Sequence, residues 1–226
     1  MGRRREGPAT ANGSALSGRS PFLLLLPLAG GVGLVAHVLV GISLGFAVTV
    51  LVAAAASMWV AAWRLATPAV RSRLRSRIAA GVKAGVVATA AYDACRYGVV
   101  SALAFSFEPF HVWSLYGRLF VGASTSEPVA FAAGAAYHLA NGIGFALAFA
   151  LVFRRPTWKL GIVWGIGLEL AMAGLYPAWL RIAALGEFLT VSAVGHVVYG
   201  AVMGAGVQRL LGRSQKTRPE VSVGTG

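Results

Sequence analysis

The sequence predicts an all-α membrane protein, a polytopic transmembrane helical bundle of about six spans. Three observations predict this class. Hydrophobic residues make up 57% of the chain and charged residues only 12%, whereas soluble domains carry about 25% charged residues. The mean hydropathy is +0.71. Several apolar runs also exceed the ~20 residues that a helix needs to cross a bilayer.

The two ends of the chain differ from its apolar middle. Residues 1–20 are polar, basic and rich in small residues, so we expect a disordered cytoplasmic arm. The apolar stretch that follows lacks a clean small-x-small cleavage motif, which favours an uncleaved first helix over a signal peptide. We expect residues 212–226 to form a disordered cytoplasmic tail, and residues 21–211 to form the transmembrane domain.

The first apolar stretch, residues 22–63, contains 42 residues without a charge. One helix of that length would extend ~63 Å, about twice the hydrocarbon thickness of a bilayer. Basic segments flank both ends, so we expect a helical hairpin that turns near 38–42, where Gly41 permits a turn. The alternative is one long tilted helix with its N-terminus outside.

Four further apolar segments follow, and the charges of their connections indicate the topology. The six predicted spans cover about 22–38, 42–63, 78–105, 129–153, 159–180 and 188–208. Basic residues concentrate in the arm, after the second span, between the fourth and fifth spans and after the sixth. The other connections hold only two arginines, Arg118 and Arg181. By the positive-inside rule both termini are cytoplasmic, which predicts a multi-pass protein of the inner (plasma) membrane.

The connection 106–128 is long and aromatic. Pro109 is a good first-turn residue, and the aromatic side chains after it recur at helical spacing. They are Phe110, Trp113, Tyr116 and Phe120. We therefore expect a short helix on the outer leaflet, either as an interfacial aromatic anchor or as a lid over an outward-facing cavity.

The net charge of +13 does not indicate a nucleic-acid partner. The basic residues lie in short segments beside apolar runs, where they report topology, and no basic domain interleaved with aromatic residues exists. The expected partner is the lipid bilayer, together with further copies of the chain or a membrane complex. Cys95 is the only cysteine, which excludes an internal disulfide.

A few polar residues lie at membrane depth, where such side chains are costly and usually face the interior of a bundle. They are Asp93 and Arg96 in the third span, His138 and Asn141 in the fourth, Glu169 in the fifth and His196 in the sixth. Counting 1.5 Å per residue places the two acids and two histidines at overlapping depths, roughly 9–16 Å below the outer surface, with Arg96 one turn above Asp93. The sequence therefore predicts one polar cluster in the outer half of the bilayer.

Glycines at steps of four indicate which helix faces pack together, because small residues let membrane helices approach closely. A step of four drifts by only about 40° around a helix. The predicted packing residues are Gly81, Gly85, Gly142, Gly161, Gly165, Gly200 and Gly204. Each buried ionisable group thus lies on, or beside, a face that packs against protein.

The same pattern suggests a repeat. Spans 3 and 4 supply an acid and then a His-x3-Gly-x3-Ala helix, and spans 5 and 6 supply an acid and then a His-x3-Gly-x3-Gly helix. The two hairpins run in the same orientation, so a parallel repeat about the membrane normal would relate them. The first hairpin has His37 at the same spacing but no acid.

Three functions fit the cluster. The first is small-molecule or ion handling, by transport or binding, with titratable carboxyl and imidazole groups. The second is a structural or assembly subunit in which polar groups bond helices together. The third is a redox protein in which His138 and His196 bind haem b or a transition metal. We expect no cofactor under either of the first two functions.

An intramembrane hydrolase is a weaker match. The run "GAST" with Ser124 is similar to the Gly-x-Ser element of rhomboid proteases, but Thr125 stands where that family has glycine. Helix capping accounts for a serine in this connection. The sequence leaves the question of an enzyme open and favours a protein that is not one.

Four runs resemble a family of prokaryotic multi-span membrane proteins that has no assigned activity. They are "ATAAYDACRYG" (88–98), "YHLANGIGFALAF" (137–149), "GIGLELAMAGLYP" (165–177) and "GHVVYG" (195–200). The resemblance covers about 78–211. It implies that the recurring motifs of the family include Asp93, His138, Glu169 and His196.

Overall fold

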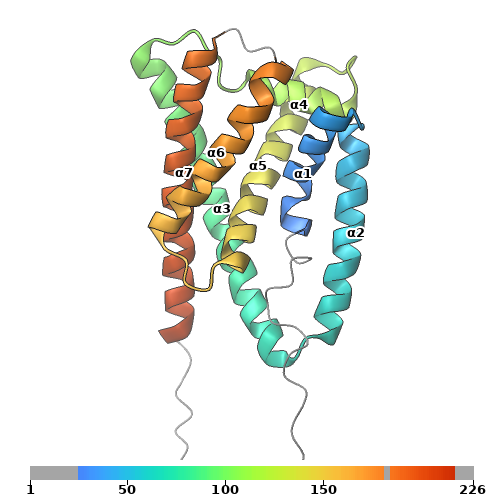
Figure 1. Cartoon of the computed structure of the whole chain (residues 1–226), viewed down its shortest axis with the longest axis vertical. Helices are drawn as coiled ribbons and strands as arrows, with labels where there is room; N and C mark the ends of the chain where they lie inside the picture. Colours follow the sequence, from blue (N-terminus) through green and yellow to red (C-terminus); the bar gives the residue numbers. More distant parts are fainter. Residues whose placement is uncertain (1–24, 181–183, 217–226) are drawn as a thin grey trace, which may run out of the picture.

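The chain forms a bundle of α-helices, seen here in a computed structural model that describes residues 25–180 and 184–216. The helices are α1 (Leu25–Val40), α2 (Leu44–Leu65), α3 (Pro68–Leu103), α4 (His111–Val121), α5 (Glu127–Val152), α6 (Trp158–Leu180) and α7 (Leu185–Lys216) (Figure 1). Within these ranges five helices, α2, α3, α5, α6 and α7, are long and apolar enough to cross a membrane, and α1 is a shorter apolar helix. The bundle is that of a multi-pass membrane protein.

Some predictions concern residues that the structure does not describe. The basic arm 1–20, Arg181 and most of the expected tail lie outside the described residues. The cytoplasmic location of both termini and the count of six spans stay predictions.

The long apolar stretch 22–63 is divided between α1 and α2. The break falls at residues 41–43, where Gly41 adopts a left-handed backbone with φ of +76°, a conformation that glycine enters at little cost. The Gly41 N–H donates to the carbonyl oxygen of His37, and the His37 Nδ1–H donates to the Ile42 carbonyl at 2.8 Å. His37 therefore stabilises this turn.

Two arginines donate hydrogen bonds to carbonyl groups at the C-terminal ends of α2 and α5. Arg71 donates from Nε and Nη2 to the carbonyl oxygens of Trp63 and Arg64, at 2.9 and 3.0 Å. Arg77 of α3 donates to the Phe153 carbonyl at the end of α5, at 2.8 Å. The last carbonyls of a helix have no partner within the helix and carry its negative dipole end. These cations therefore stabilise helix ends as well as contributing to the charge pattern.

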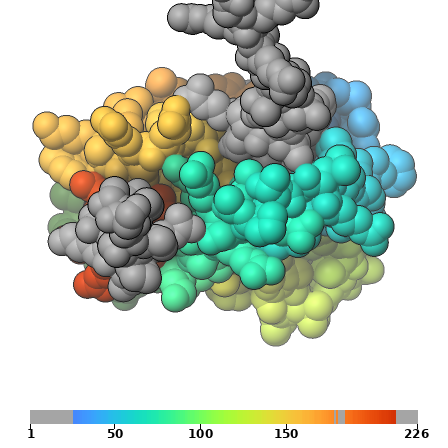
Figure 2. Space-filling model, turned by 90° about the horizontal axis from the view of Figure 1, so that it is seen from below, coloured from blue at the N-terminus to red at the C-terminus, as the bar shows by residue number. Residues whose placement is uncertain are grey.

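The basic side chains gather at the end of the bundle opposite α4. Figure 2 views this end, where the α2–α3 junction and the α5–α6 connection lie on one face. The elements there carry Arg64, Arg71, Arg73, Arg75, Arg77, Arg154, Arg155, Lys159, Arg209 and Arg213. At the α4 end, Arg118 pairs with Glu127. The charge asymmetry read from the sequence thus runs along the long axis of the bundle.

Close backbone approach joins α3 to α5. A Cβ on Gly81 or Gly85 would lie 2.8 Å from a Cα atom of α5, closer than packed atoms come. From the other side, a Cβ on Gly142 would overlap with Thr89 of α3. The tight contact lets side chains of α3 reach those of α5 directly.

A similar contact joins α6 to α7. Gly161 and Gly165 face the α7 backbone at Gly200, Gly204 and His196. A Cβ on Gly204 would lie 2.9 Å from the Cα of Trp158. All seven glycines that the sequence marked for packing therefore lie where two described helices meet closely.

The aromatic helix expected between 106 and 128 is α4, and it lies across one end of the bundle (Figure 1). It packs tightly on α5, because Gly117 faces the Ala130 carbonyl and Gly134 faces the Trp113 carbonyl. Tyr116 is buried. The expectation of a surface helix is therefore incomplete, since one side of α4 is part of the protein core.

Candidate functional site

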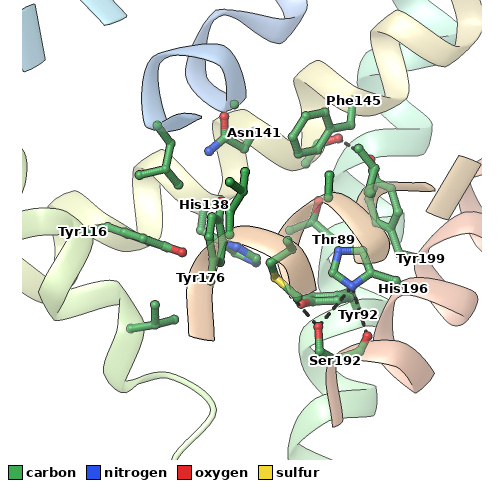
Figure 3. Close-up of a pocket in the computed structure, with 18 of the residues that line it drawn as sticks. Thr89, Tyr92, Tyr116, His138, Asn141, Phe145, Tyr176, Ser192, His196 and Tyr199 are labelled. Carbon is green, nitrogen blue, oxygen red and sulfur yellow. Dashed lines mark hydrogen bonds between the residues drawn. The ribbon is translucent and has the colours of Figure 1, made fainter. Parts of the chain in front are cut away.

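A cavity of about 350 Å³ lies among α1, α3, α5, α6 and α7, and α4 with the segment before it contributes to one end. Most of the lining is apolar. Figure 3 shows polar side chains from several helices pointing into the same space. The polar residues of the lining are Thr89, Tyr92, Arg96, Tyr116, His138, Asn141, Tyr176, Ser192, His196 and Tyr199. Four of the six residues predicted for the cluster are in this set.

The other two predicted residues, Asp93 and Glu169, do not line the cavity, and each lies against a histidine that does. Glu169 Oε2 lies 2.8 Å from His196 Nδ1 and accepts a hydrogen bond from Ser192 Oγ at 2.5 Å. Glu169 and Ser192 are 8% and 3% exposed, so this carboxyl is satisfied inside the protein. His196 Nδ1 also lies 3.0 Å from the carbonyl oxygen of Ser192, to which it can only donate, and its Nε2 lies on the Thr89 side of the ring (Figure 3).

The second acid–imidazole pair joins α3 to α5. His138 Nε2 lies 3.1 and 3.2 Å from the two carboxylate oxygens of Asp93. Asp93 also pairs with Arg96, one helical turn along α3, at 3.7 Å. The Trp113 ring of α4 packs on the imidazole, with centroids 5.3 Å apart. Each acid of the sequence pattern is thus paired with the histidine of the helix that packs against its own.

The buried ring of Tyr92 connects the two pairs. Its centroid lies 5.8 Å from that of His138 and 5.0 Å from that of His196. The guanidinium carbon of Arg96 lies 5.1 Å from the same ring, within the range of a cation–π contact. Both imidazoles therefore contact the same aromatic ring.

Arg96 is buried, with 4% of its surface exposed. It donates from Nη2 to the carbonyl oxygen of Pro109, in the segment before α4. Its Nε has no hydrogen-bond partner among the described residues. The Arg96 charge is therefore only partly compensated.

The segment between α3 and α4 covers the same end of the cavity. Phe107 lines the cavity and packs against Phe188 of α7, with ring centroids 5.6 Å apart. The Phe107 N–H donates to Glu187 at 2.9 Å, and Ser106 Oγ donates to the same carboxylate oxygen at 3.2 Å. Of the two roles considered for this connection, cover of a cavity is the one these contacts favour.

Asn141 and His37 lie apart from the acid–imidazole pairs. Asn141 lines the cavity on the α1 side, where its side chain occupies the space beside Gly30. His37 contacts Trp179 edge to face, with centroids 5.5 Å apart, and lies in the last turn of α1. The third histidine at the Gly-spaced pattern therefore has a structural partner and does not line the cavity.

Sequence reasoning left six polar residues of the lining out of the cluster, and three of these six make contacts that organise the site. They are Tyr92, which contacts both imidazoles, Ser192, which donates to Glu169, and Tyr199, whose hydroxyl donates to the Gly142 carbonyl at 2.6 Å. Signals for them existed: Tyr92 precedes the intramembrane acid, and Ser192 lies one helical turn before His196. Tyr199 follows it by three residues.

The residues at hand can move protons and bind polar groups. Burial raises the pKa of Tyr116, outside the long spans, so this phenol stays a neutral hydrogen-bonding group. Among the described residues, no three His, Cys, Asp or Glu side chains form a group that could hold a metal ion. Two imidazoles, each beside a carboxyl group, line the cavity.

Comparisons with family models, with curated proteins and with solved structures give no match. The chemistry of the cavity is therefore the basis for a functional proposal.

Proposed function

We propose that this protein is a membrane carrier that binds a small, mainly apolar molecule in the central cavity together with protons. One observation carries the proposal: two acid–imidazole pairs, Asp93–His138 and Glu169–His196, border a single cavity from two different pairs of helices.

The size and lining of the cavity support a small ligand. Ligand sites have volumes of roughly 300–1,000 Å³, with mainly apolar walls and a few convergent polar groups. The cavity of about 350 Å³ falls at the lower end of this range. It suits a molecule with an apolar body and one polar head.

The paired acids support proton coupling. Imidazole is the side chain that ordinarily changes charge near neutral pH. Glu169 Oε2 lies 2.8 Å from His196 Nδ1, so a carboxyl group lies directly beside this imidazole. Ionisable residues at membrane depth commonly mark substrate paths and proton relays.

A structural subunit is the second candidate, and specific contacts favour it. Arg96 and Tyr199 donate to backbone carbonyls of other elements, as interhelical bonds do. Such bonds contribute about 0.6–2 kcal/mol each in membranes. This candidate predicts loss of stability, with no effect on ligand binding, when a polar group is removed.

Glu169→Gln tests the two candidates against each other. The amide keeps the shape of the side chain but cannot carry the charge that pairs with His196. The protein, purified in detergent, is titrated with octanol, octylamine and octanesulfonate over a range of pH, and the shift in Tm is measured. Under the proposal at least one probe stabilises the protein in a pH-dependent way, and the variant loses most of that dependence.

Glu108→Gln is the matched control, since Glu108 is an exposed carboxyl before α4. It should keep the parent response. Failure of every probe to bind the parent at any pH would rule out the carrier proposal, as would an unchanged pH response in Glu169→Gln.

A further inference from the structure

Arg96 has more hydrogen-bonding capacity than the protein uses. A guanidinium carries several N–H donors in a planar fork and no acceptor. Among the described residues Arg96 makes one hydrogen bond, to the Pro109 carbonyl, and its Nε has no partner. The carboxylate of Asp93 lies 3.7 Å from Nη1, beyond hydrogen-bond distance. Buried donors are rarely left unsatisfied, so this cation has room for an acceptor.

The position of Arg96 gives a ligand access to it. Arg96 lines the cavity, together with Ser192 and His196. The rings of Tyr92 and Phe110 lie 5.1 and 5.9 Å from its guanidinium carbon and hold the group in place. Phe107 lines the same end of the cavity. A ligand head at this end would be shielded from water, where a charge-assisted hydrogen bond is strong.

The rest of the cavity fits an apolar body. The α1 side contributes Leu28, Gly31, Val32, Leu34 and Val35, and α6 contributes Leu168, Ala171, Met172 and Leu175. A molecule with its head at Arg96 would lie with its chain along these walls.

The charge balance of the site depends on the two imidazoles. With both protonated, three cations, Arg96, His138 and His196, face the carboxylates of Asp93 and Glu169. With both neutral, one cation faces the same two carboxylates. An anionic head is therefore attracted more strongly when protons are bound. The other titratable groups of the lining are phenols, which are neutral near pH 7: Tyr92, Tyr116, Tyr176 and Tyr199. The α1 residues of the lining include no titratable group.

We infer that the ligand is a small organic oxyanion, an apolar chain with a carboxylate or similar anionic head that Arg96 binds, and that it enters with protons on His138 and His196. This inference rests on the proposed function and names the class of its substrate. Proton uptake and anion binding then occur as one event, with no covalent step.

Matched probes with the same chain test the head group. Octanesulfonate stays ionised throughout the pH range, so any pH dependence of its binding comes from the protein. We expect octanesulfonate to bind at least about tenfold more tightly than octanol, as a hydrogen bond to a charged group provides. Its affinity should rise as the pH falls. Binding is measured by isothermal titration calorimetry on the full chain in detergent.

Arg96→Lys tests the role of the guanidinium, because lysine keeps the charge but not the planar fork. Octanesulfonate affinity should fall about tenfold, while octanol affinity stays the same. Arg118→Lys, at an exposed ion pair with Glu127 at the same end, is the control and should bind like the parent.

A second measurement needs no variant. Octanesulfonate added to the parent protein in weakly buffered solution should cause proton uptake, read with a pH indicator. Absence of uptake overturns the coupling, even if Arg96→Lys does not fold. Tighter binding of octylamine or equal binding of octanol overturns the oxyanion assignment and leaves the carrier proposal standing. Binding by none of the probes removes both.

Discussion

Ser192 is the residue that makes the buried carboxyl of Glu169 tolerable. Its hydroxyl donates to Glu169 Oε2 at 2.5 Å, and His196 Nδ1 lies 2.8 Å from the same oxygen. A buried charge is costly unless it is paired and hydrogen-bonded. The serine thus supplies the hydrogen bond that this buried carboxyl needs, next to a histidine that faces the cavity.

Ser192→Ala should therefore lower stability. Removing the hydroxyl leaves Glu169 with one donor fewer, at a cost of about 1–3 kcal/mol. The expected result is a lower Tm in detergent, by several degrees. Ser57→Ala, whose hydroxyl bonds its own exposed helix turn, should leave Tm nearly unchanged. Equal Tm values for the two variants would contradict the role given to Ser192.

At the level of elements, the α6–α7 contact sets the distance between Glu169 and His196. Gly165 faces the carbonyl of His196 with no room for a Cβ. Any added carbon must move one helix away from the other, and with it one partner of the pair.

Gly165→Ala should separate the pair, and Gly167→Ala on the same helix should not, because a Cβ on Gly167 meets nothing within 4 Å. Overpacking costs about 1–3 kcal/mol. We expect Gly165→Ala to lower Tm and to weaken the pH dependence of ligand binding. Parent-like behaviour of both variants, in calorimetry and in binding, would show that the helix contact does not control the site.

The positions of the helices and their packing faces could be predicted from the sequence, because apolar runs and Gly spacing are local patterns. The break at Gly41, the aromatic helix after Pro109 and the close approach at Gly200 all follow from such patterns. The hydrogen-bond partners that join side chains of two different helices could not be predicted from such local patterns. The bond from Ser192 to Glu169 depends on the relative rotation of α6 and α7, and a serine in a span carries no charge to mark it.

At the scale of the whole molecule, charge runs along the long axis. Among the described residues, most arginines and lysines lie at one end, on the helix ends and the α5–α6 connection there, and the α4 end holds Arg118 beside Glu127. Cytoplasmic connections of membrane proteins carry the excess of basic residues. The α4 end, with the covered end of the cavity, is therefore predicted to face away from the cytoplasm.

Single cysteines test this orientation. Cys95→Ser removes the natural thiol, and Thr125→Cys or Arg155→Cys then places one thiol at either end. Intact cells are treated with a membrane-impermeant maleimide. We expect labelling at position 125, in the connection before α5, and labelling at position 155 only after the cells are opened. The reverse pattern would invert the topology, and labelling of both in intact cells would show a leaky preparation or a mixed orientation.

The placement of the acids behind the histidines also bears on competition by inorganic ions. Among the described residues that line the cavity there is no carboxylate, since Asp93 and Glu169 face their imidazole partners. Mg²⁺ and Ca²⁺ bind through oxygen ligands, carboxylates above all. A cavity wall of nitrogen donors, phenols and hydrocarbon offers these ions little. Mg²⁺ and Ca²⁺ should therefore bind poorly in this cavity.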